Sequence, residues 1–193
     1  MRHACKGSSE ELFLLHIKQR RLLMKIAIIG YSGSGKSTLA QHLGSYYQLP
    51  VLHLDTIQFK VNWQARSQDK VRADLADFLQ QNQSWVIDGN YSWCFYERRM
   101  KEADQIIFLN FSLWSCLYRA FKRYLKYLNQ TRESMAPGCS EKFDWEFIRW
   151  ILWDGRTKTT KSRYQKVRQT YPEKFIELQN QMQLTEYVKA SLR

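Results

Sequence analysis

The chain has 193 residues and a formal net charge of +12, with 44% hydrophobic and 25% charged residues. This length suits one α/β domain with a real core and is too short for two ordinary domains. No apolar run approaches the ~20 residues of a membrane span. The four cysteines form no C-x-x-C pair and lie in no histidine cluster, which indicates reduced thiols in a cytosolic protein and not a disulfide frame or a zinc site.

Residues 1–23 look separate from the domain, which we expect to span 24–193. Met24 directly precedes the first apolar stretch, as an initiator methionine would. Residues 10–21 could form a short basic amphipathic helix, but their charges follow the apolar stretch, unlike those of a secretory signal. We expect a poorly ordered or non-native extension or a short helix. A helix lying on a membrane surface is the alternative.

The first motif is a phosphate-binding loop. Residues 30–37 fit the pattern G-x-x-x-x-G-K-[ST] at every fixed position. The stretch 25–29 predicts a buried strand before the loop, and 38–43 predicts a helix after it. Backbone N–H groups and the helix dipole then attract phosphate, whereas a chance glycine-serine turn would lack these neighbours.

This motif predicts ATP and Mg²⁺ as cofactors. Lys36 is expected to reach the β and γ phosphates, and the Ser37 hydroxyl to ligate Mg²⁺. The loop residues expected to hold the nucleotide are Gly30, Ser32, Gly33, Ser34, Gly35, Lys36, Ser37 and Thr38.

Two further predicted strands, 50–55 and 85–89, both end near a carboxylate, and a helix is predicted between them over 67–81. Asp88 stands where a carboxylate could hold Mg²⁺ or its water shell. Asp55 could orient or deprotonate an acceptor hydroxyl, or contact the metal through water. The alternative for each is a helix cap or a turn former, which is common after strands.

The rest of the chain continues the alternation of helices and strands. A long helix carries an apolar stripe on one face, and a turn-rich segment with Pro137-Gly138 follows it. The expected elements are a helix over 92–101, a strand over 104–110, a helix over about 113–128, turns over 129–140, helices over 144–153 and 157–169, a strand over 174–178 and a helix over 184–192. This order predicts a parallel sheet covered on both faces, with the ligand at the carboxyl ends of its strands.

Most of the excess positive charge lies between Arg119 and Arg168, where thirteen Lys and Arg face five Asp and Glu. Such a cluster suits a polyanionic ligand, although it could also be a solvated face without one. Arg119 and Arg123 share a helix face and could both fork onto phosphate oxygens. The other candidates are Arg98 and Arg99 for an acceptor phosphate, and Arg132, Arg156 and Arg163 for a lid that closes over the phosphates.

Aromatic residues follow the Asp55 and Asp88 strands. They could wall an acceptor pocket that stacks a base or a sugar, or they could simply pack the core and its rim. They are Phe59, Trp63, Tyr91, Trp93 and Tyr96.

The runs from Met24 to Gly30 and from Gly35 to Ala40 resemble nucleoside-phosphate and related small-molecule kinases. The run Trp85–Tyr91 (WVIDGNY) resembles bacterial P-loop proteins known as DNA topology modulation proteins, or FlaR-like proteins. Further pieces fit that family: Leu54-Asp55 with Trp63, the pair Arg119 and Arg123, and the stretch 138–150, which begins GCSEKF. Together they cover about 24–192.

This resemblance implies a three-layer α/β/α P-loop fold like that of nucleoside-phosphate kinases, with a five-stranded parallel sheet and a helical lid insertion at about 129–157. It also implies ATP binding and kinase activity. Two departures stand out. Asn90-Tyr91-Ser92-Trp93 stands where adenylate kinases carry Pro-Arg, which leaves the acceptor open, and Asn110 replaces an Asp at the end of the fourth strand, which leaves a metal role at position 110 open.

Two hypotheses follow. The first is a kinase that transfers the ATP γ-phosphate to a small molecule, with Lys36, Asp55, Asp88, Arg119 and Arg123 as catalytic residues, Ser37 and Asp88 at the metal, and Arg119 and Arg156 added to the nucleotide contacts. The second is a nucleotide-binding, DNA-associated regulator with little chemistry. We find no helix-turn-helix signature, no zinc finger and no Asn-Lys-x-Asp guanine motif. Acceptor identity and the choice between monomer and homodimer stay open.

Overall fold

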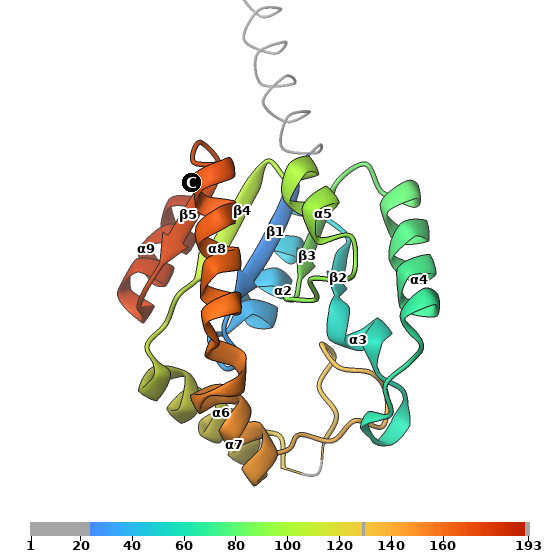
Figure 1. The fold of residues 1–193 in the computed structure, drawn as a ribbon, viewed down its shortest axis with the longest axis vertical. Helices are drawn as coiled ribbons and strands as arrows, with labels where there is room; N and C mark the ends of the chain where they lie inside the picture. Colours follow the sequence, from blue (N-terminus) through green and yellow to red (C-terminus); the bar gives the residue numbers. More distant parts are fainter. Residues whose placement is uncertain (1–23, 129, 192–193) are drawn as a thin grey trace, which may run out of the picture.

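The computed structural model describes residues 24–128 and 130–191 (Figure 1). The expected extension over 1–23 lies outside these residues. Five parallel strands form one sheet in the order β2-β3-β1-β4-β5. The strands are β1 Lys25–Gly30, β2 Val51–His53, β3 Trp85–Asp88, β4 Gln105–Leu109 and β5 Phe175–Leu178. Within the described residues, every helix is too short or too polar to cross a membrane.

Helices cover both faces of this sheet, as the sequence predicts. In Figure 1, α5 and α8 lie in front of the strands, α2 lies behind them, and α6 and α7 lie beyond one end of the sheet. The helices are α2 Lys36–Tyr47, α3 Leu54–Gln58, α4 Gln68–Gln81, α5 Tyr96–Glu102, α6 Leu113–Lys126, α7 Trp145–Leu152, α8 Lys158–Thr170 and α9 Gln181–Ser191, with short 3-10 turns at Val61–Trp63 and Asp154–Arg156.

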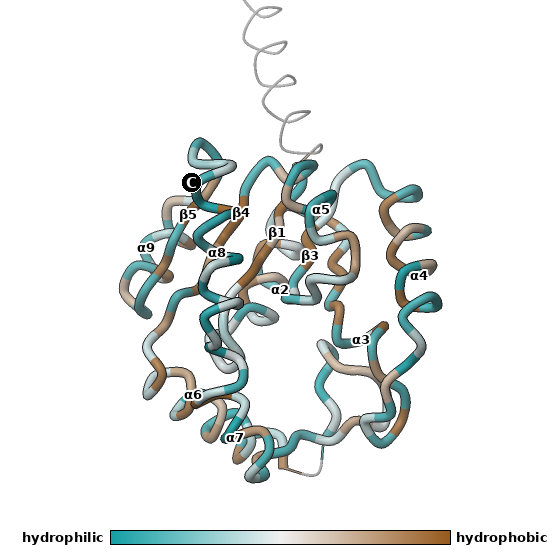
Figure 2. Tube along the Cα trace, viewed as in Figure 1, coloured by the Kyte–Doolittle hydropathy of each residue, from teal (hydrophilic) through white to brown (hydrophobic). Residues whose placement is uncertain are grey.

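The central strands hold the core. Residues 26–29 of β1 have no exposed surface, and neither do residues 85–87 of β3, as expected for parallel strands buried on both faces. Figure 2 shows these strands as the hydrophobic centre, with hydrophilic segments around them. The register pairs Ile28 with Asp88 and Gly30 with Leu109. It therefore brings the phosphate loop and Asp88 to the same edge of the sheet.

Side-chain caps fix where three of the helices begin. Ser112, Asp144 and Thr157 each accept a hydrogen bond from a backbone N–H in the first turn of α6, α7 and α8 respectively. Because an N-cap supplies a partner for an otherwise unsatisfied N–H, these positions stop the helices from extending backward. The predicted starts at 113, 144 and 157 agree with the structure to within one residue.

Among the predicted boundaries, two that bear on the site were wrong. Strand β2 ends at His53, so Asp55 lies in the first turn of the short helix α3 and not at the end of a strand. The helix expected over 92–101 begins only at Tyr96, because Phe95 has a left-handed backbone (φ +45°) and turns precede it.

The segment expected to be a lid reaches across to the segment that follows α3. The Asn62 N–H donates to the carbonyl of Gly138 at 3.2 Å, and the Trp63 indole donates to the carbonyl of Ser140 at 3.0 Å. A small apolar cluster of Phe59, Trp63, Met135, Ala136 and Cys139 seals this contact. Helix α7 lies after this loop and packs on α6, where the Arg123 guanidinium lies 5.6 Å from the Phe147 ring centre.

Candidate functional site

The phosphate loop joins β1 to α2, and two of its glycines permit close packing. Gly33 has φ +80°, and a Cβ there would lie 2.4 Å from the Cys116 carbonyl oxygen. Gly35 has φ +98°, and its Cβ would lie 2.5 Å from a guanidinium nitrogen of Arg119. A side chain at either position would strain the backbone. At Gly33 it would also collide with the backbone of α6, and at Gly35 it would displace the Arg119 guanidinium. Helix α6 thus packs directly on the loop and brings Arg119 over its end.

Lys36 lies over the loop, and its Nζ donates to the Tyr31 carbonyl at 3.0 Å. Burial lowers the pKa of the Lys36 ammonium, while the carboxylates of Asp88 and Asp55 act against that change. The amine therefore stands in a site where a further negative charge would stabilise its cationic form.

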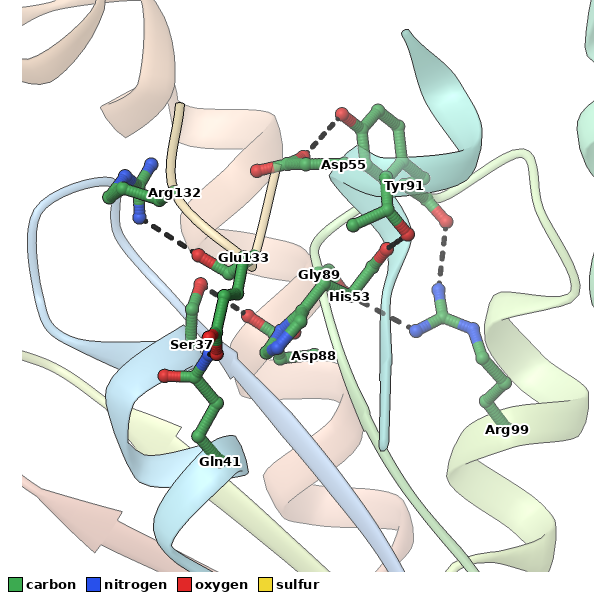
Figure 3. A network of polar contacts seen from close by, with 12 residues as sticks. Ser37, Gln41, His53, Asp55, Asp88, Gly89, Tyr91, Arg99, Arg132 and Glu133 are labelled. Carbon is green, nitrogen blue, oxygen red and sulfur yellow. Dashed lines mark hydrogen bonds and ion pairs between the residues drawn. The ribbon is translucent and has the colours of Figure 1, made fainter. Parts of the chain in front are cut away.

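Three polar side chains meet beside Lys36 (Figure 3). The Ser37 hydroxyl donates to Asp88 Oδ2 at 2.9 Å, and His53 Nδ1 contacts the other carboxylate oxygen of Asp88. Asp88 is 4% exposed, and His53 is also buried. The strand register pairs His53 with Asp88. The carboxylate is therefore fixed from both sides and turned towards the loop.

His53 is a site residue that the sequence analysis missed. Its one signal was its place near the end of the second predicted strand, beside Leu54-Asp55. A single histidine next to an apolar run is more often a packed residue than a functional one, so that signal is weak.

Asp55 and Tyr91 form the second polar pair of the site. The Tyr91 hydroxyl donates to Asp55 Oδ1 at 2.6 Å, and Figure 3 shows the ring beside the carboxylate. Burial raises the pKa of Asp55, and the charge of Asp88 adds to this effect, whereas the Tyr91 hydrogen bond, Lys36 and Arg132 lower it. A carboxylate with a raised pKa and one oxygen already occupied is suited to accept a proton through its other oxygen.

The arginines after the Asp88 strand do not lie where an acceptor phosphate would need them. Arg99 is fully buried and donates to the carbonyls of Cys94, Gly89 and Tyr91 at 3.2, 3.3 and 3.0 Å. Burial lowers its pKa to about 10, so it stays cationic at neutral pH. Arg98 pairs with Glu102 on the surface of α5. Arg99 is therefore the support of the turn that presents Tyr91.

Replacing Arg99 should destabilise the protein without removing a charge from the phosphate site. Arg99→Met removes the guanidinium donor from the buried carbonyls of Cys94 and Gly89, while the Tyr91 carbonyl keeps the Cys94 N–H. We therefore expect the free energy of unfolding to fall by about 2–3 kcal/mol in urea titrations. The neighbour variant Arg98→Met loses only an exposed pair and should change it by less than ~0.5 kcal/mol. Equal stability of the two variants would contradict the support role.

Three of the other predicted arginines, Arg119, Arg123 and Arg132, lie on α6 and in the segment after it. Arg123 and Arg132 both bind Glu141, whose side chain is 2% exposed; Arg123 Nε lies 2.7 Å from Glu141 Oε1. Arg119 contacts Gln181 and stacks on Phe111. The structure thus brings the predicted catalytic residues Arg119 and Arg123 to the loop, and Glu141 is a further residue that the sequence did not single out.

Arg156 approaches the loop from another side. Its guanidinium lies 3.7 Å from the centre of the Tyr31 ring and donates to the Phe111 carbonyl at 3.0 Å. Nearby, the Trp150 indole of α7 donates to the Ser32 hydroxyl at 3.0 Å. The contact of Arg156 with nucleotide stays a prediction. Arg156 and Trp150 both connect the segment around α7 to the phosphate loop.

A cavity of about 310 Å³ opens beside the end of the loop. It is bounded by α2, α9 and Arg119, and both aliphatic and polar residues line it. The lining residues are Gly35, Thr38, Leu39, His42, Arg119, Gln181, Leu184, Thr185 and Val188. The predicted nucleotide residues Gly35, Thr38 and Arg119 therefore share one hollow surface.

Several solved structures with a similar fold are kinases. The chain matches a shikimate kinase from Acinetobacter baumannii in complex with shikimate, at 16% identity and a TM-score of 0.55, over 91% of this chain and 94% of that one. It also matches a deoxyadenosine kinase from M. mycoides with bound dATP, at 15% identity and a TM-score of 0.50, over 88% and 100%. At these identities the similarity shows the P-loop kinase-like fold. No protein-family model and no curated protein sequence matches the chain.

Proposed function

We propose that this protein is an ATP-dependent phosphotransferase that acts on a small molecule. The observation that carries the proposal is the junction of three parts at one sheet edge: the phosphate loop, the Ser37–Asp88 pair and the Asp55–Tyr91 pair. Phosphoryl transfer needs alignment of donor and acceptor and positive charge around the transferring group, which this edge offers. Lys36, Arg119 and Arg123 supply that charge.

On the donor side, the loop would hold the triphosphate through the amides of Lys36 and Ser37, which lack partners within the helix at the start of α2. The cavity between α2 and α9, which Arg119 also lines, would take the nucleoside part. Arg156 steadies Tyr31 of the loop.

The residues present fit the Mg²⁺ that this chemistry requires. A hydroxyl and a carboxylate stand 2.9 Å apart at Ser37 and Asp88, and hard oxygen donors of this kind suit Mg²⁺. The described residues contain no cluster of three His, Cys, Asp or Glu side chains that could hold a metal by themselves. Ser37 and Asp88 would therefore hold it together with phosphate and water. When bound, the metal neutralises charge on the phosphate oxygens. His53 keeps the Asp88 carboxylate in position.

On the acceptor side, Asp55 takes the proton of the attacking hydroxyl. The Tyr91 hydrogen bond stabilises the ionised carboxylate and so lowers its pKa, against the effect of burial. Asp55 must be ionised to accept the proton, so the rate should fall as the pH drops through its pKa.

Tyr91→Phe should move that acid limb of kcat to higher pH. The variant removes the hydrogen bond that favours the charged form, so the pKa of Asp55 rises further above its usual range. Asp88, Lys36 and Arg132, the other charges that act on Asp55, are unchanged. Initial rates from pH 5 to 9 measure the shift, with Tyr124→Phe on α6 as the control. An unchanged pH profile of kcat would mean that Tyr91 does not set the pKa of Asp55.

The acceptor is inferred to be a neutral hydroxyl compound. The arginines of the segments around Asp55 and Tyr91 are engaged within the protein: Arg66 pairs with Asp74, Arg72 binds the Trp93 carbonyl, and Arg99 is buried. The Tyr91 ring, whose hydroxyl binds Asp55, packs against Trp93, and Phe59 and Trp63 pack on each other in the segment that follows α3. A site of this kind suits a nucleoside or a polyol better than its phosphate.

Matched acceptor pairs test this proposal with radiolabelled ATP. We expect labelled product from at least one nucleoside or polyol, and at least tenfold less from the corresponding phosphate ester at equal concentration. Label transferred only to phosphorylated acceptors would reject the neutral acceptor but keep the kinase. No ATP binding in calorimetry and no label transfer to any acceptor would reject the kinase itself.

The resemblance to DNA topology modulation proteins leaves a second candidate, a nucleotide-binding protein that acts on DNA. It predicts duplex binding that weakens steeply with salt. In the basic segment, Arg123 and Arg132 bind Glu141 and Arg149 binds Asp154, which reduces the charge free to meet a duplex. Absence of duplex binding at low salt would remove this candidate.

A further inference from the structure

The outward face of α6 carries an apolar stripe. Its members are Trp114, Tyr118, Phe121, Leu125 and, just beyond the helix, Leu128, with exposed fractions of 73%, 59%, 43%, 56% and 47%. The buried residues of this helix are the small Cys116 and Ala120. A helix at the surface of a soluble protein normally turns its large apolar side chains to the core. This one packs Leu117 on the core but turns these five outward, and the Phe121 ring also touches the Phe143 ring at 5.3 Å between centres. The stripe therefore marks an interaction surface.

The spacing of the stripe identifies the kind of partner. The steps from 114 to 118, 121, 125 and 128 alternate between four and three residues. This is the heptad spacing by which two helices pack side by side. A membrane surface or a nucleic acid would not require it.

The order of side chains along the stripe makes it complementary to itself. The aromatic rings Trp114 and Tyr118 stand in its first half, and Leu125 and Leu128 in its second half. In an antiparallel pair of α6 helices, Trp114 would face Leu128 and Tyr118 would face Leu125, with Phe121 on the two-fold axis. Each large ring then meets a smaller aliphatic side chain, as an isologous interface requires.

The exposed area is also of the right size. The five side chains offer on the order of 600 Å² of apolar surface per copy, given the area that whole side chains of these types expose. A stable interface buries about 800 Å² per partner. Neighbouring side chains at the rim of the stripe, including Lys122 and Lys126, are exposed and can supply the remaining buried area.

We propose that α6 forms a two-fold antiparallel dimer interface between two copies of this chain. Arg119 contacts Gln181 and Arg123 binds Glu141, away from the stripe, so each copy keeps its own site complete. Lys122 and Lys126 lie on one flank of the stripe, and the two-fold axis would place both pairs on the same side. The dimer should therefore tighten when salt screens these charges.

Engineered disulfides test the geometry on the full chain. In a Cys5→Ser background, Phe121→Cys should give a covalent dimer on mild oxidation, because the axis places the two sulfurs within reach. The matched variant Trp114→Cys should give at least tenfold less, since its two copies would lie about 20 Å apart along the helices. Equal cross-linking of both variants, or of neither, would overturn the antiparallel pairing.

Sedimentation velocity tests the association itself. Wild-type protein at about 50 µM should sediment as a dimer, and more completely at 0.5 M than at 0.1 M salt. Tyr118→Glu with Leu125→Glu should give a monomer with an unchanged melting temperature, because both positions are exposed. Met182→Glu, which alters an equally exposed side chain on α9, should stay dimeric. A monomeric wild-type protein at both salt concentrations would overturn the proposal.

Discussion

Lys36→Ala should abolish phosphoryl transfer while leaving the fold intact. The Lys36 amine lies over the phosphate loop, 3.0 Å from the Tyr31 carbonyl and under the influence of Asp88 and Asp55. It is the cation best placed to stabilise the negative charge on the transferring phosphoryl group. Loss of one stabilising group of this kind typically lowers kcat by 10²–10³-fold. We expect a loss of at least that size in ATP turnover measured at saturating acceptor.

The stability of this variant gives a second readout. Burial lowers the pKa of Lys36, which means that the protein holds the charged amine at some cost. Removing it should therefore leave the melting temperature unchanged or raise it slightly. Lys158→Ala, at the exposed start of α8, is the control and should keep full activity. Wild-type turnover in Lys36→Ala would refute the proposed donor site.

Asp55→Asn should remove the acid–base step and little else. The amide keeps the shape of the side chain and its oxygen can still accept the Tyr91 hydrogen bond, but it cannot take a proton. We expect kcat to fall by about 10²–10⁴-fold, the usual contribution of a general base. The Kd for ATP, measured by calorimetry, should change less than threefold.

The pH profile distinguishes a proton acceptor from a residue that only shapes the pocket. In Asp55→Asn the acid limb of kcat should disappear, because the titrating group is gone. A variant in the same segment, Thr56→Val, loses a hydroxyl that donates to the His53 carbonyl at 2.7 Å and should keep the limb. If Asp55→Asn retained both the wild-type kcat and the acid limb, another group would be the base.

Local sequence pattern predicted most of the fold. The phosphate loop, the five strands and the helices around them follow from β-branched runs, helical spacing and capping residues, all of which act over a few neighbouring positions. The parallel sheet and the shared edge follow from right-handed βαβ connections, whereas the strand order β2-β3-β1-β4-β5 came only from the structure. The predicted sites at Lys36, Ser37 and Asp88 therefore came together as the pattern implied.

Where the local signal was short, the prediction was less accurate. The apolar run ending in Asp55 looked like one strand, but pairing with β3 stops at His53 and the chain turns into α3. Arg99 looked like a surface cation in a basic helix, yet three backbone carbonyls bind it in the interior. Nothing within a few residues of Arg99 distinguishes it from Arg98.

The sequence by itself determined which segments build the sheet and which loop fits the phosphate-binding pattern, because glycine geometry and hydrophobic periodicity are local properties. The tertiary structure decided which side chains meet: His53 with Asp88 across 35 positions, Asp55 with Tyr91 across 36, and Trp150 with Ser32 across 118. It also decided that the apolar stripe of α6 faces outward. Such contacts depend on how whole elements pack against one another, and that packing is set by the buried surface of the entire chain.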